Sequence, residues 1–430
     1  MPHEMIDLKE EMEKKEKVII AALESPVFSA RADEILDEME RLVETAGGEV
    51  VGRVVQRRKY PHPAYYFGKG KLRDIKKYAE HLGADTLIVD GELTATQIRN
   101  MEDITGLKVI DRTQLILDIF ARHATTEEGK LQVELAQLKY NLPRIVGVGS
   151  QMSRLGGGIG TRGPGEKKLE IDRRRIRKRI SVIRRKLEDL EKDRKLRRQK
   201  RKENVKVVSL AGYTNAGKST LLKALSGDES IKAVDRLFAT LSPTMRRVKL
   251  PSGREVVFAD TVGFIRRLPH TLIEAFKATL EEVKYSDLIL TVVDSSDEDW
   301  QSKYRVVKGV LKEIGAGDVP RLLVFNKIDL LPEEDLEDLK REYPDAIFIS
   351  AARKEGIDDL LSAVEEHLFE DEVVEEILVP YDKIGVLWRF EGDVQIEKVS
   401  SEEDGERYRI RGERSMVERL KSAIGLRDSS

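Results

Sequence analysis

VKVVSLAGYTNAGKST, residues 205–220, is the stretch that decides the fold of this chain's central part. It begins as an apolar run typical of a buried strand, and Gly212–Ser219 matches the pattern G-x-x-x-x-G-K-[ST]. In this pattern, backbone N–H groups wrap a phosphate, the lysine contacts the outer phosphates, and the hydroxyl binds Mg²⁺. The stretch predicts a nucleotide-binding α/β domain whose phosphate contacts come from Gly212, Tyr213, Thr214, Asn215, Ala216, Gly217, Lys218, Ser219 and Thr220.

A second motif selects the base. Asn326-Lys327-Ile328-Asp329 follows the apolar run Arg321–Phe325. A carboxylate such as Asp329 accepts hydrogen bonds from N1–H and N2–H₂ of guanine, whereas adenine has no donor at either place, and an unpaired buried carboxylate would be costly. Ser350-Ala351 closes the next predicted strand, where guanine-binding domains present a backbone N–H to the base. We therefore expect GTP and GDP as ligands.

The metal and γ-phosphate contacts are expected between these two motifs. Asp260-Thr-Val-Gly263 ends another predicted strand; Asp260 should hold Mg²⁺ through its water shell, and the Gly263 N–H should face the γ-phosphate. Thr240 is the candidate for a second Mg²⁺-binding hydroxyl, with Thr244 as the alternative. The predicted metal ligands are Ser219, Thr240 and Asp260, and the predicted catalytic residues are Lys218, Thr240 and Gly263.

Three further units are predicted beside this nucleotide-binding domain: residues 1–124, 125–204 and 372–430. Residues 1–124 alternate strand-like and helical runs, which indicates a small parallel α/β domain. Residues 205–371 continue the alternation after the phosphate-binding motif, and residues 372–430 predict a small α+β domain with a helix at Asp382–Phe390, strands at Val394–Val399 and Tyr408–Arg411, and a helix at Ser415–Ala423.

Residues 125–204 carry a different pattern. Two leucine and isoleucine series are spaced alternately by 3 and 4 residues, which is heptad patterning on two helices. The intervening segment 147–165 holds eight glycines and predicts a loop, so we expect an antiparallel coiled-coil hairpin. The two series are Leu131, Leu135, Leu138 and Leu142, and Ile176, Ile180, Ile183, Leu187 and Leu190.

The charge of this hairpin suggests a polyanionic partner. The whole chain has a net charge of -2, but residues 166–203 contain 19 Lys or Arg against 8 Asp or Glu. A solvated helix face and a flexible glycine connector are the simpler interpretations. Because acidic residues fall far short of neutralising the segment, we favour contact of the basic helix and of the loop, with Arg154 and Arg162, with RNA.

Composition excludes several other classes. With no cysteine, the chain has no disulfide framework, and its six histidines show no metal-binding spacing. The N-terminus lacks an apolar signal region, and no apolar run is long enough to span a membrane. The heptad seam uses up the hairpin's apolar stripe, which disfavours membrane contact. We expect a cytoplasmic monomer that binds neither DNA nor membranes.

The motifs together resemble the HflX family of translational GTPases, within the Obg–HflX group. The resemblance rests on GYTNAGKST (212–220), LFATLSPT (237–244), DTVGF (260–264) and Asn326–Asp329, and outside this domain on YFGKG (66–70), DRT (111–113) and SRLGGGIGTRGPGEKK (153–168). It implies a Ras-like GTPase domain after an α/β domain and hairpin that bind the large ribosomal subunit. It also implies GTP hydrolysis linked to subunit dissociation, recycling or rescue.

Two residues bear on the rate of hydrolysis. Phe264 stands where Ras-type enzymes place a water-orienting glutamine, so intrinsic turnover should be slow. Asn215 stands where some related GTPases carry an asparagine in a P-loop that binds K⁺, so K⁺ is a candidate cofactor beside Mg²⁺. The alternatives to a ribosome-bound regulator are an assembly or RNA-remodelling factor that also uses ATP, and a signalling switch that acts on proteins.

Overall fold

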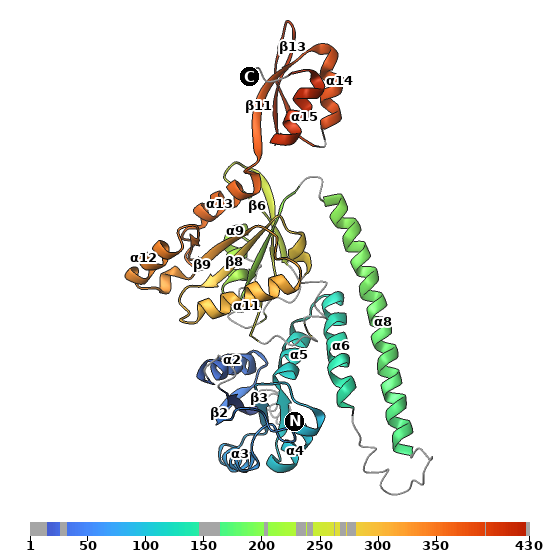
Figure 1. The fold of residues 1–430 in the computed structure, drawn as a ribbon, viewed down its shortest axis with the longest axis vertical. Coiled ribbons are helices and arrows are strands. Elements are labelled where there is room, and N and C mark those ends of the chain that lie inside the picture. Colours follow the sequence, from blue (N-terminus) through green and yellow to red (C-terminus); the bar gives the residue numbers. More distant parts are fainter. Residues whose placement is uncertain are drawn as a thin grey trace, which may run out of the picture.

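The computed structural model describes residues 15–25, 32–145, 164–201, 205–228, 238, 244–261, 263–266, 272, 281–391 and 393–426. Three sheets follow one another along the long axis of the molecule (Figure 1). The N-terminal sheet lies at one end, the central sheet in the middle and the C-terminal sheet at the other end, while the long helix α8 runs beside the first two.

The N-terminal sheet is parallel, in the order β2-β1-β3-β4. Alternate side chains of β1 pack on opposite faces: Ile20 belongs to the apolar cluster with α2 and α5, and Ile19 to the cluster with α3 and α4. This is the two-layered burial expected of a parallel sheet. The elements are β1 (Lys17–Glu24), α2 (Ala32–Thr45), β2 (Glu49–Arg57), α3 (Lys69–Leu82), β3 (Thr86–Val89), α4 (Ala95–Thr105), β4 (Lys108–Asp111) and α5 (Arg112–His123).

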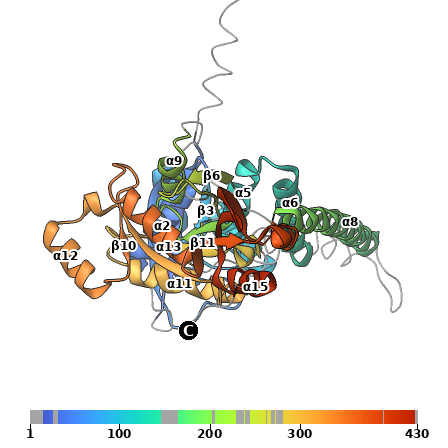
Figure 2. The same cartoon turned by 90° about the horizontal axis from the view of Figure 1, so that it is seen from above.

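Two helices, α6 (Glu127–Asn141) and α8 (Pro164–Arg201), form the hairpin, with the 3-10 turn η1 (Leu142–Arg144) after α6. Their apolar cluster consists of the heptad residues identified in the sequence, with Ile183 fully buried. Arg179 of α8 binds Glu134 of α6 at 2.6 Å. Seen from above, α8 stands out to the side of the molecule opposite α12 (Figure 2). Of the predicted loop 147–165, residues 147–163 lie outside the described residues, and the last two residues begin α8 instead.

The central sheet has the order β10-β9-β8-β5-β7-β6, and all neighbours are parallel except β6 and β7. Its elements are β5 (Val207–Gly212), α9 (Lys218–Ser226), β6 (Thr244–Lys249), β7 (Glu255–Asp260), the 3-10 turn η3 (Glu281–Tyr285), β8 (Leu288–Asp294), α11 (Trp300–Glu313), β9 (Arg321–Asn326), the 3-10 turn η4 (Ile328–Leu330), α12 (Glu333–Glu342), β10 (Ile347–Phe348) and α13 (Ile357–Phe369). The fold class expected from the sequence is confirmed, but the edge strand β6 was missed because only Val248 among its residues is buried.

The C-terminal sheet is antiparallel, in the order β11-β13-β12. The sequence did not predict β11, since five of its eight residues are Glu or Val that is not buried, in no clear alternation. The expected helix at 382–390 is a short α-helix between two 3-10 turns. The elements are β11 (Glu372–Val379), η5 (Tyr381–Lys383), α14 (Ile384–Leu387), η6 (Trp388–Phe390), β12 (Gln395–Glu402), β13 (Gly405–Glu413) and α15 (Arg414–Ile424).

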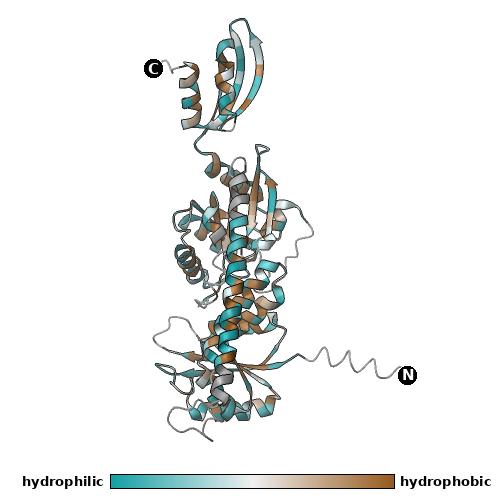
Figure 3. Cartoon of the chain, turned by 90° about the vertical axis from the view of Figure 1, so that its right-hand side faces the viewer, coloured by the Kyte–Doolittle hydropathy of each residue, from teal (hydrophilic) through white to brown (hydrophobic). Residues whose placement is uncertain are grey.

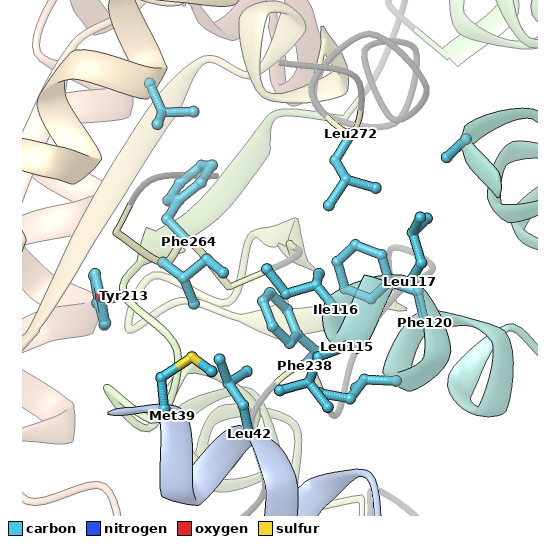
Figure 4. Close-up of a cluster of buried hydrophobic side chains, with 14 of the residues drawn as sticks. Met39, Leu42, Leu115, Ile116, Leu117, Phe120, Tyr213, Phe238, Phe264 and Leu272 are labelled. Atoms are coloured by element: carbon cyan, nitrogen blue, oxygen red, sulfur yellow. The ribbon is translucent and has the colours of Figure 1, made fainter. Parts of the chain in front are cut away.

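One apolar cluster joins the N-terminal domain to the central domain. Met39 and Leu42 of α2 and Phe120 of α5 lie in the same cluster as Phe264, which follows β7, and Phe238 (Figure 4). The rings of Phe120 and Phe238 pack edge to face with centroids 4.7 Å apart. The side of α2 and α5 that faces away from the N-terminal sheet is therefore covered by Phe238 and by Phe264.

Candidate functional site

The phosphate-binding loop connects β5 to α9 in a tight left-handed turn. Asn215 has φ 64° and Gly217 has φ 88°. A Cβ at Gly217 would overlap the Asn326 side chain, so this position admits only glycine. The turn leads directly into the N-terminus of α9, where the first backbone N–H groups of a helix lie outside its own hydrogen-bond ladder. This is the geometry that binds a phosphate.

Lys218 lies at the first residue of α9 with its ammonium group inside the loop. Its Nζ donates to the carbonyl oxygens of Gly212 at 3.1 Å and Tyr213 at 2.8 Å. Burial lowers the pKa of Lys218 to about 8, while the nearby Asp260 carboxylate opposes this shift. A buried cation with a lowered pKa gains strongly from a phosphate anion beside it.

Ser219 and Asp260, both predicted as metal ligands, lie next to each other. The Ser219 hydroxyl donates to Oδ2 of Asp260 at 2.6 Å, and Asp260 is 1% exposed at the end of β7. A hydroxyl and a carboxylate this close supply the hard oxygen ligands that Mg²⁺ prefers, with phosphate and water oxygens completing its octahedron. These residues therefore fit Mg²⁺. The described residues contain no group of three or more His, Asp or Glu that could bind a metal without such a ligand.

Of the two candidates for the second Mg²⁺-binding hydroxyl, the structure describes one, Thr244. Thr240 lies outside the described residues. Thr244 begins β6 and is the direct register partner of Asp260 across the β6–β7 pair. Both residues stay candidates.

Asn326, at the end of β9, connects the phosphate-binding loop to the predicted base-binding loop. Its Nδ2 donates to the Ala216 carbonyl at 2.9 Å, and its Oδ1 accepts from the Ala351 N–H at 3.0 Å. Asn326 is 2% exposed, so each of these hydrogen bonds is protected from water. One buried amide thus sets the spacing between the loop that follows β5 and the loop that follows β10.

The remaining base-binding candidates surround this amide. Lys327 adopts the left-handed conformation with φ 67° and binds Asp294, at the end of β8, at 2.7 Å. The Asp329 side chain is 12% exposed and lies 3.5 Å from Arg353. Ser350 is fully buried, and its Oγ accepts from the Arg353 N–H at 3.2 Å.

Gly263 and Phe264 lie against the phosphate-binding loop. A Cβ on Gly263 would lie 3.2 Å from Nζ of Lys218, so the Gly263 backbone stands directly beside that ammonium group. Phe264 donates its N–H to the Gly212 carbonyl at 3.1 Å and accepts from the Thr214 N–H at 2.7 Å. Its ring is 1% exposed within the interdomain cluster, so it does not face a phosphate-bound water.

The described candidates thus meet at one edge of the central sheet, at the carboxyl ends of β5, β7 and β9. Sequence reasoning missed Asp294, which holds Lys327, and Arg266, which binds Glu34 of the N-terminal domain at 3.0 Å. Asp294 follows a seven-residue apolar strand, and that position at the same sheet edge was the available signal. No local pattern marks Arg266, because its partners come from distant segments.

Three consecutive segments of the chain match models of known protein families. Residues 33–121 match the family model described as GTP-binding GTPase N-terminal, residues 123–201 match GTP-binding GTPase Middle Region, and residues 207–327 match 50S ribosome-binding GTPase. A GTPase HflX of Caldanaerobacter subterraneus subsp. tengcongensis is 55% identical over 86% of this chain and 84% of its own length. The chain belongs to the GTPase HflX family.

A second HflX relative agrees with this assignment. The GTPase HflX of Escherichia coli K12 is 45% identical over 86% of this chain and 88% of its own length. Among solved structures, a GTP-binding protein from the archaeon Sulfolobus solfataricus in complex with GDP is 27% identical, covers 82% of this chain and 99% of that chain, and has a TM-score of 0.41. As an HflX GTPase, the chain binds GTP and GDP and hydrolyses GTP. Within the part of the chain that the structure describes, no helix has both the length and the apolarity to cross a bilayer.

The lowered pKa of Lys218 predicts how GDP affinity changes with pH. Phosphate binding raises this pKa, so the contribution of Lys218 to GDP affinity should be constant below about pH 8 and fall as pH rises above it. Above that pH, Lys218 must take up a proton when GDP binds. The loss of GDP affinity then approaches about tenfold per pH unit. Calorimetric titration across pH 6.5–9.5 measures this, with pH values chosen on both sides of the transition.

Lys218→Ala is the matched control, because the titration of the nucleotide itself is common to both proteins. The variant should bind GDP more weakly, and the ratio of wild-type to variant affinity should decline above about pH 8. A constant ratio over the whole range would contradict the position assigned to Lys218.

Proposed function

We propose that GTP·Mg²⁺ binds across the carboxyl ends of β5, β7 and β9, with the roles expected from the sequence. Lys218 and the backbone of Gly212–Thr220 hold the phosphates, while Ser219, Asp260 and either Thr240 or Thr244 hold Mg²⁺. Asp329 and the N–H of Ala351 read the guanine. The observation that carries this proposal is the Asn326 amide, which joins the phosphate loop to the base loop through Ala216 and Ala351.

Catalysis at this site would depend mainly on where charged groups and N–H donors lie relative to the phosphates. Mg²⁺ and Lys218 would neutralise charge that develops on the phosphates, and the Gly263 N–H would donate to the γ-phosphate. Because the Phe264 ring is buried between domains, it orients no water. Intrinsic hydrolysis should therefore be slow and depend on a further group.

K⁺ is our candidate for that further group, through Asn215. This residue stands in the left-handed turn of the phosphate loop, and an amide oxygen is a hard ligand of the kind that such cations prefer. We expect GTP turnover at equal ionic strength to be several-fold faster in KCl than in NaCl, and Asn215→Ala to lose this difference. Equal GTP turnover in the two salts would show that K⁺ does not contribute to hydrolysis.

We further propose that the hairpin α6–α8 binds the large ribosomal subunit and that GTP controls this binding. Several basic side chains are exposed on α8: Arg174, Arg177, Lys178, Arg184, Arg185 and Lys186. Figure 3 shows hydrophilic residues along this long helix, whose apolar side is used against α6. Such a basic stripe on a chain of net charge -2 fits the phosphate backbone of RNA.

The proposed outcome of this binding is separation or recycling of ribosomal subunits. A rigid hairpin that is anchored to the N-terminal domain and stands out beside the GTPase domain can occupy space at a subunit interface (Figure 2). The basic stripe and the glycine-rich loop would contact ribosomal RNA. The family model for 207–327, described as 50S ribosome-binding GTPase, supports this choice of partner.

Asp329→Asn should change base preference. Its amide can no longer accept hydrogen bonds from both guanine donors, so GDP affinity should fall by roughly 10²-fold or more. Xanthosine diphosphate carries a carbonyl in place of the 2-amino group, and the new amide N–H should bind it more tightly than GDP. Asp335→Asn, on the exposed surface of α12, is the control. If Asp329→Asn keeps its GDP affinity, the base site is misassigned.

Charge neutralisation tests the hairpin. The triple variant Arg174→Gln, Arg177→Gln, Lys178→Gln should weaken GTP-dependent binding to 50S subunits and reduce the salt slope by about 2 to 3 units, roughly one for each lost phosphate contact. Arg173 is left intact because it donates to the Ile145 carbonyl at 3.0 Å. The control neutralises three exposed basic residues of the GTPase domain, Arg305, Lys308 and Lys312.

Sedimentation with purified 50S subunits tests binding to the large subunit, and sedimentation with 70S ribosomes tests separation of the subunits. We expect the wild-type chain with a non-hydrolysable GTP analogue to bind 50S and to reduce the 70S peak. A salt slope equal to that of the control would exclude the hairpin as the RNA contact. Binding to 50S subunits with an unchanged 70S peak would exclude subunit separation but would still support binding to the large subunit.

A further inference from the structure

Arg144 lies in the turn η1 after α6 and joins the hairpin to the N-terminal sheet. Its Nη1 donates to the Tyr140 carbonyl at 2.9 Å, and its guanidinium carbon lies 3.5 Å from the centre of the Tyr140 ring. Its Nη2 donates to the Leu93 carbonyl at 2.7 Å and to Oδ2 of Asp111 at 3.3 Å. Leu93 follows β3 and Asp111 ends β4, so this side chain reaches the carboxyl edge of the sheet at two places. We define the hairpin anchor as Arg144 with these three partners.

The carboxylate of the hairpin anchor is fully buried. Asp111 accepts from the N–H of Gln114 at 2.9 Å, which caps α5, and from the N–H of Leu93 at 3.0 Å. Among the described residues, Arg144 is the cation that forms an ion pair with it. A buried carboxylate is costly without a counter-charge, so the end of α6 is tied to the N-terminal domain by an interaction that is expensive to break.

The hairpin anchor constrains direction, which apolar packing does less well. Val133 and Ala136 of α6 lie in the same apolar cluster as Phe120 of α5, and α8 packs on α6 through the heptad residues. Burial of apolar surface is non-directional. A planar guanidinium whose donors reach separate fixed oxygens sets an angle as well as a distance.

A second arginine carries this constraint to α8. Arg173 of α8 donates from Nη2 to the carbonyl of Ile145 at 3.0 Å, and Ile145 directly follows Arg144. One short turn is thus held to the N-terminal sheet by Arg144 and to α8 by Arg173. Figure 1 shows α8 passing beside α6 and continuing along the GTPase domain. The angle between α8 and the N-terminal sheet therefore depends on residues 144 and 145.

This angle matters because α8 is long. It has 38 residues, which corresponds to roughly 57 Å, so a tilt of about 10° at one end moves the other end by roughly 10 Å. Arg174, Arg177 and Lys178 are exposed on this helix. Hydrogen bonds between such side chains and phosphate oxygens require about 3 Å. A tilted α8 could not place its basic residues on the same set of phosphates.

We infer that Arg144 and Asp111 are positioning residues for binding to the large ribosomal subunit, because they hold α8 at the angle that its basic side chains need. This inference rests on the role proposed above for the hairpin. Asp111 is buried and the Arg144 side chain is 20% exposed, so both act through α6 and α8. When only a fraction of the chains holds the hairpin at this angle, apparent affinity falls in proportion, while the bound state keeps its phosphate contacts.

Three variants of the full-length chain separate position from charge and from stability. Arg144→Lys keeps the counter-charge of Asp111 and loses the planar fork. Arg144→Gln loses both, and the double variant Asp111→Asn, Arg144→Gln restores charge balance without the fork. Affinity for purified 50S subunits with a non-hydrolysable GTP analogue should fall by about tenfold in all three, with the salt slope of the wild type. Turnover of GTP without ribosomes should stay within about twofold of wild type.

Thermal midpoints show whether a merely structural role explains the result. The midpoint should be lowest in Arg144→Gln, because Asp111 stays buried without a counter-charge, and should recover in the double variant. Affinity for 50S subunits should not recover with it. If affinity follows the thermal midpoint through the three variants, the residues only stabilise the fold and the inference is wrong.

Spin labels measure the angle directly in the free protein. The chain contains no cysteine, so labels can be placed by Glu80→Cys on α3 and Ser181→Cys on α8, both at exposed positions. The wild-type background should give one narrow distance distribution, and Arg144→Lys a broader or shifted one. An unchanged distribution in Arg144→Lys would overturn the inference.

Arg179→Lys is the matched control. Arg179 of α8 also binds across the hairpin, to Glu134 of α6 at 2.6 Å, but this pair is exposed and lies within the hairpin. The same exchange there should leave the label distance, the 50S affinity and the salt slope unchanged.

The ribosome-binding outcomes distinguish this inference from the proposed function. If Arg144→Lys binds 50S subunits like Arg179→Lys, or if its salt slope falls, the positioning role is wrong. The triple variant Arg174→Gln, Arg177→Gln, Lys178→Gln is measured alongside. If it also binds like wild type, the proposed hairpin contact fails too, whereas a loss of affinity in the triple variant alone defeats only the present inference.

Discussion

The buried amide of Asn326 is the interaction on which the nucleotide site depends. It donates to the carbonyl of Ala216 and accepts from the N–H of Ala351, so it holds the phosphate loop and the base loop at a fixed separation. A buried hydrogen-bonding group left without its partner costs about 1 to 3 kcal/mol. The amide thus makes two loops, contributed by segments more than 100 residues apart in the chain, into one rigid surface.

The parallel order of β9, β8, β5 and β7 explains why these loops meet. Parallel strands bring their carboxyl ends to the same edge, and the chain places its polar residues there: Lys218 and Ser219 after β5, Asp260 at the end of β7, and Asn326 at the end of β9. The N-terminal domain adds a second constraint from outside this sheet. It covers Phe264 with α2 and α5 and binds Arg266, so the segment 263–266 lies between two domains.

Much of this arrangement could be predicted from the sequence, because it depends on local patterns. The phosphate loop, the strand-end motifs and the heptad series each lie in a short run of residues, and the cluster between α6 and α8 contains the leucines and isoleucines that the spacing selected. Edge strands were harder. β6 has one buried residue, Val248, and β11 is rich in glutamate, so neither shows the alternation that marks a half-buried strand.

The interdomain contacts could not be predicted, for a physical reason. Glu34, Arg112 and Arg266 are ordinary charged residues in their own segments, and their contacts come only from tertiary packing that joins residues 154 or more positions apart. Thr240 and the loop 147–163 lie outside the described residues, so their roles stay predictions.

Calorimetric titration of the purified full-length chain with GDP, GTP and ATP, each with Mg²⁺, is the decisive test of the guanine-specific site. We expect one site per chain that binds GDP and GTP, with ATP weaker by roughly 10³-fold or more because Asp329 finds no donor on adenine. Binding of ATP as tight as that of GTP, or no binding of any of the three, would contradict it.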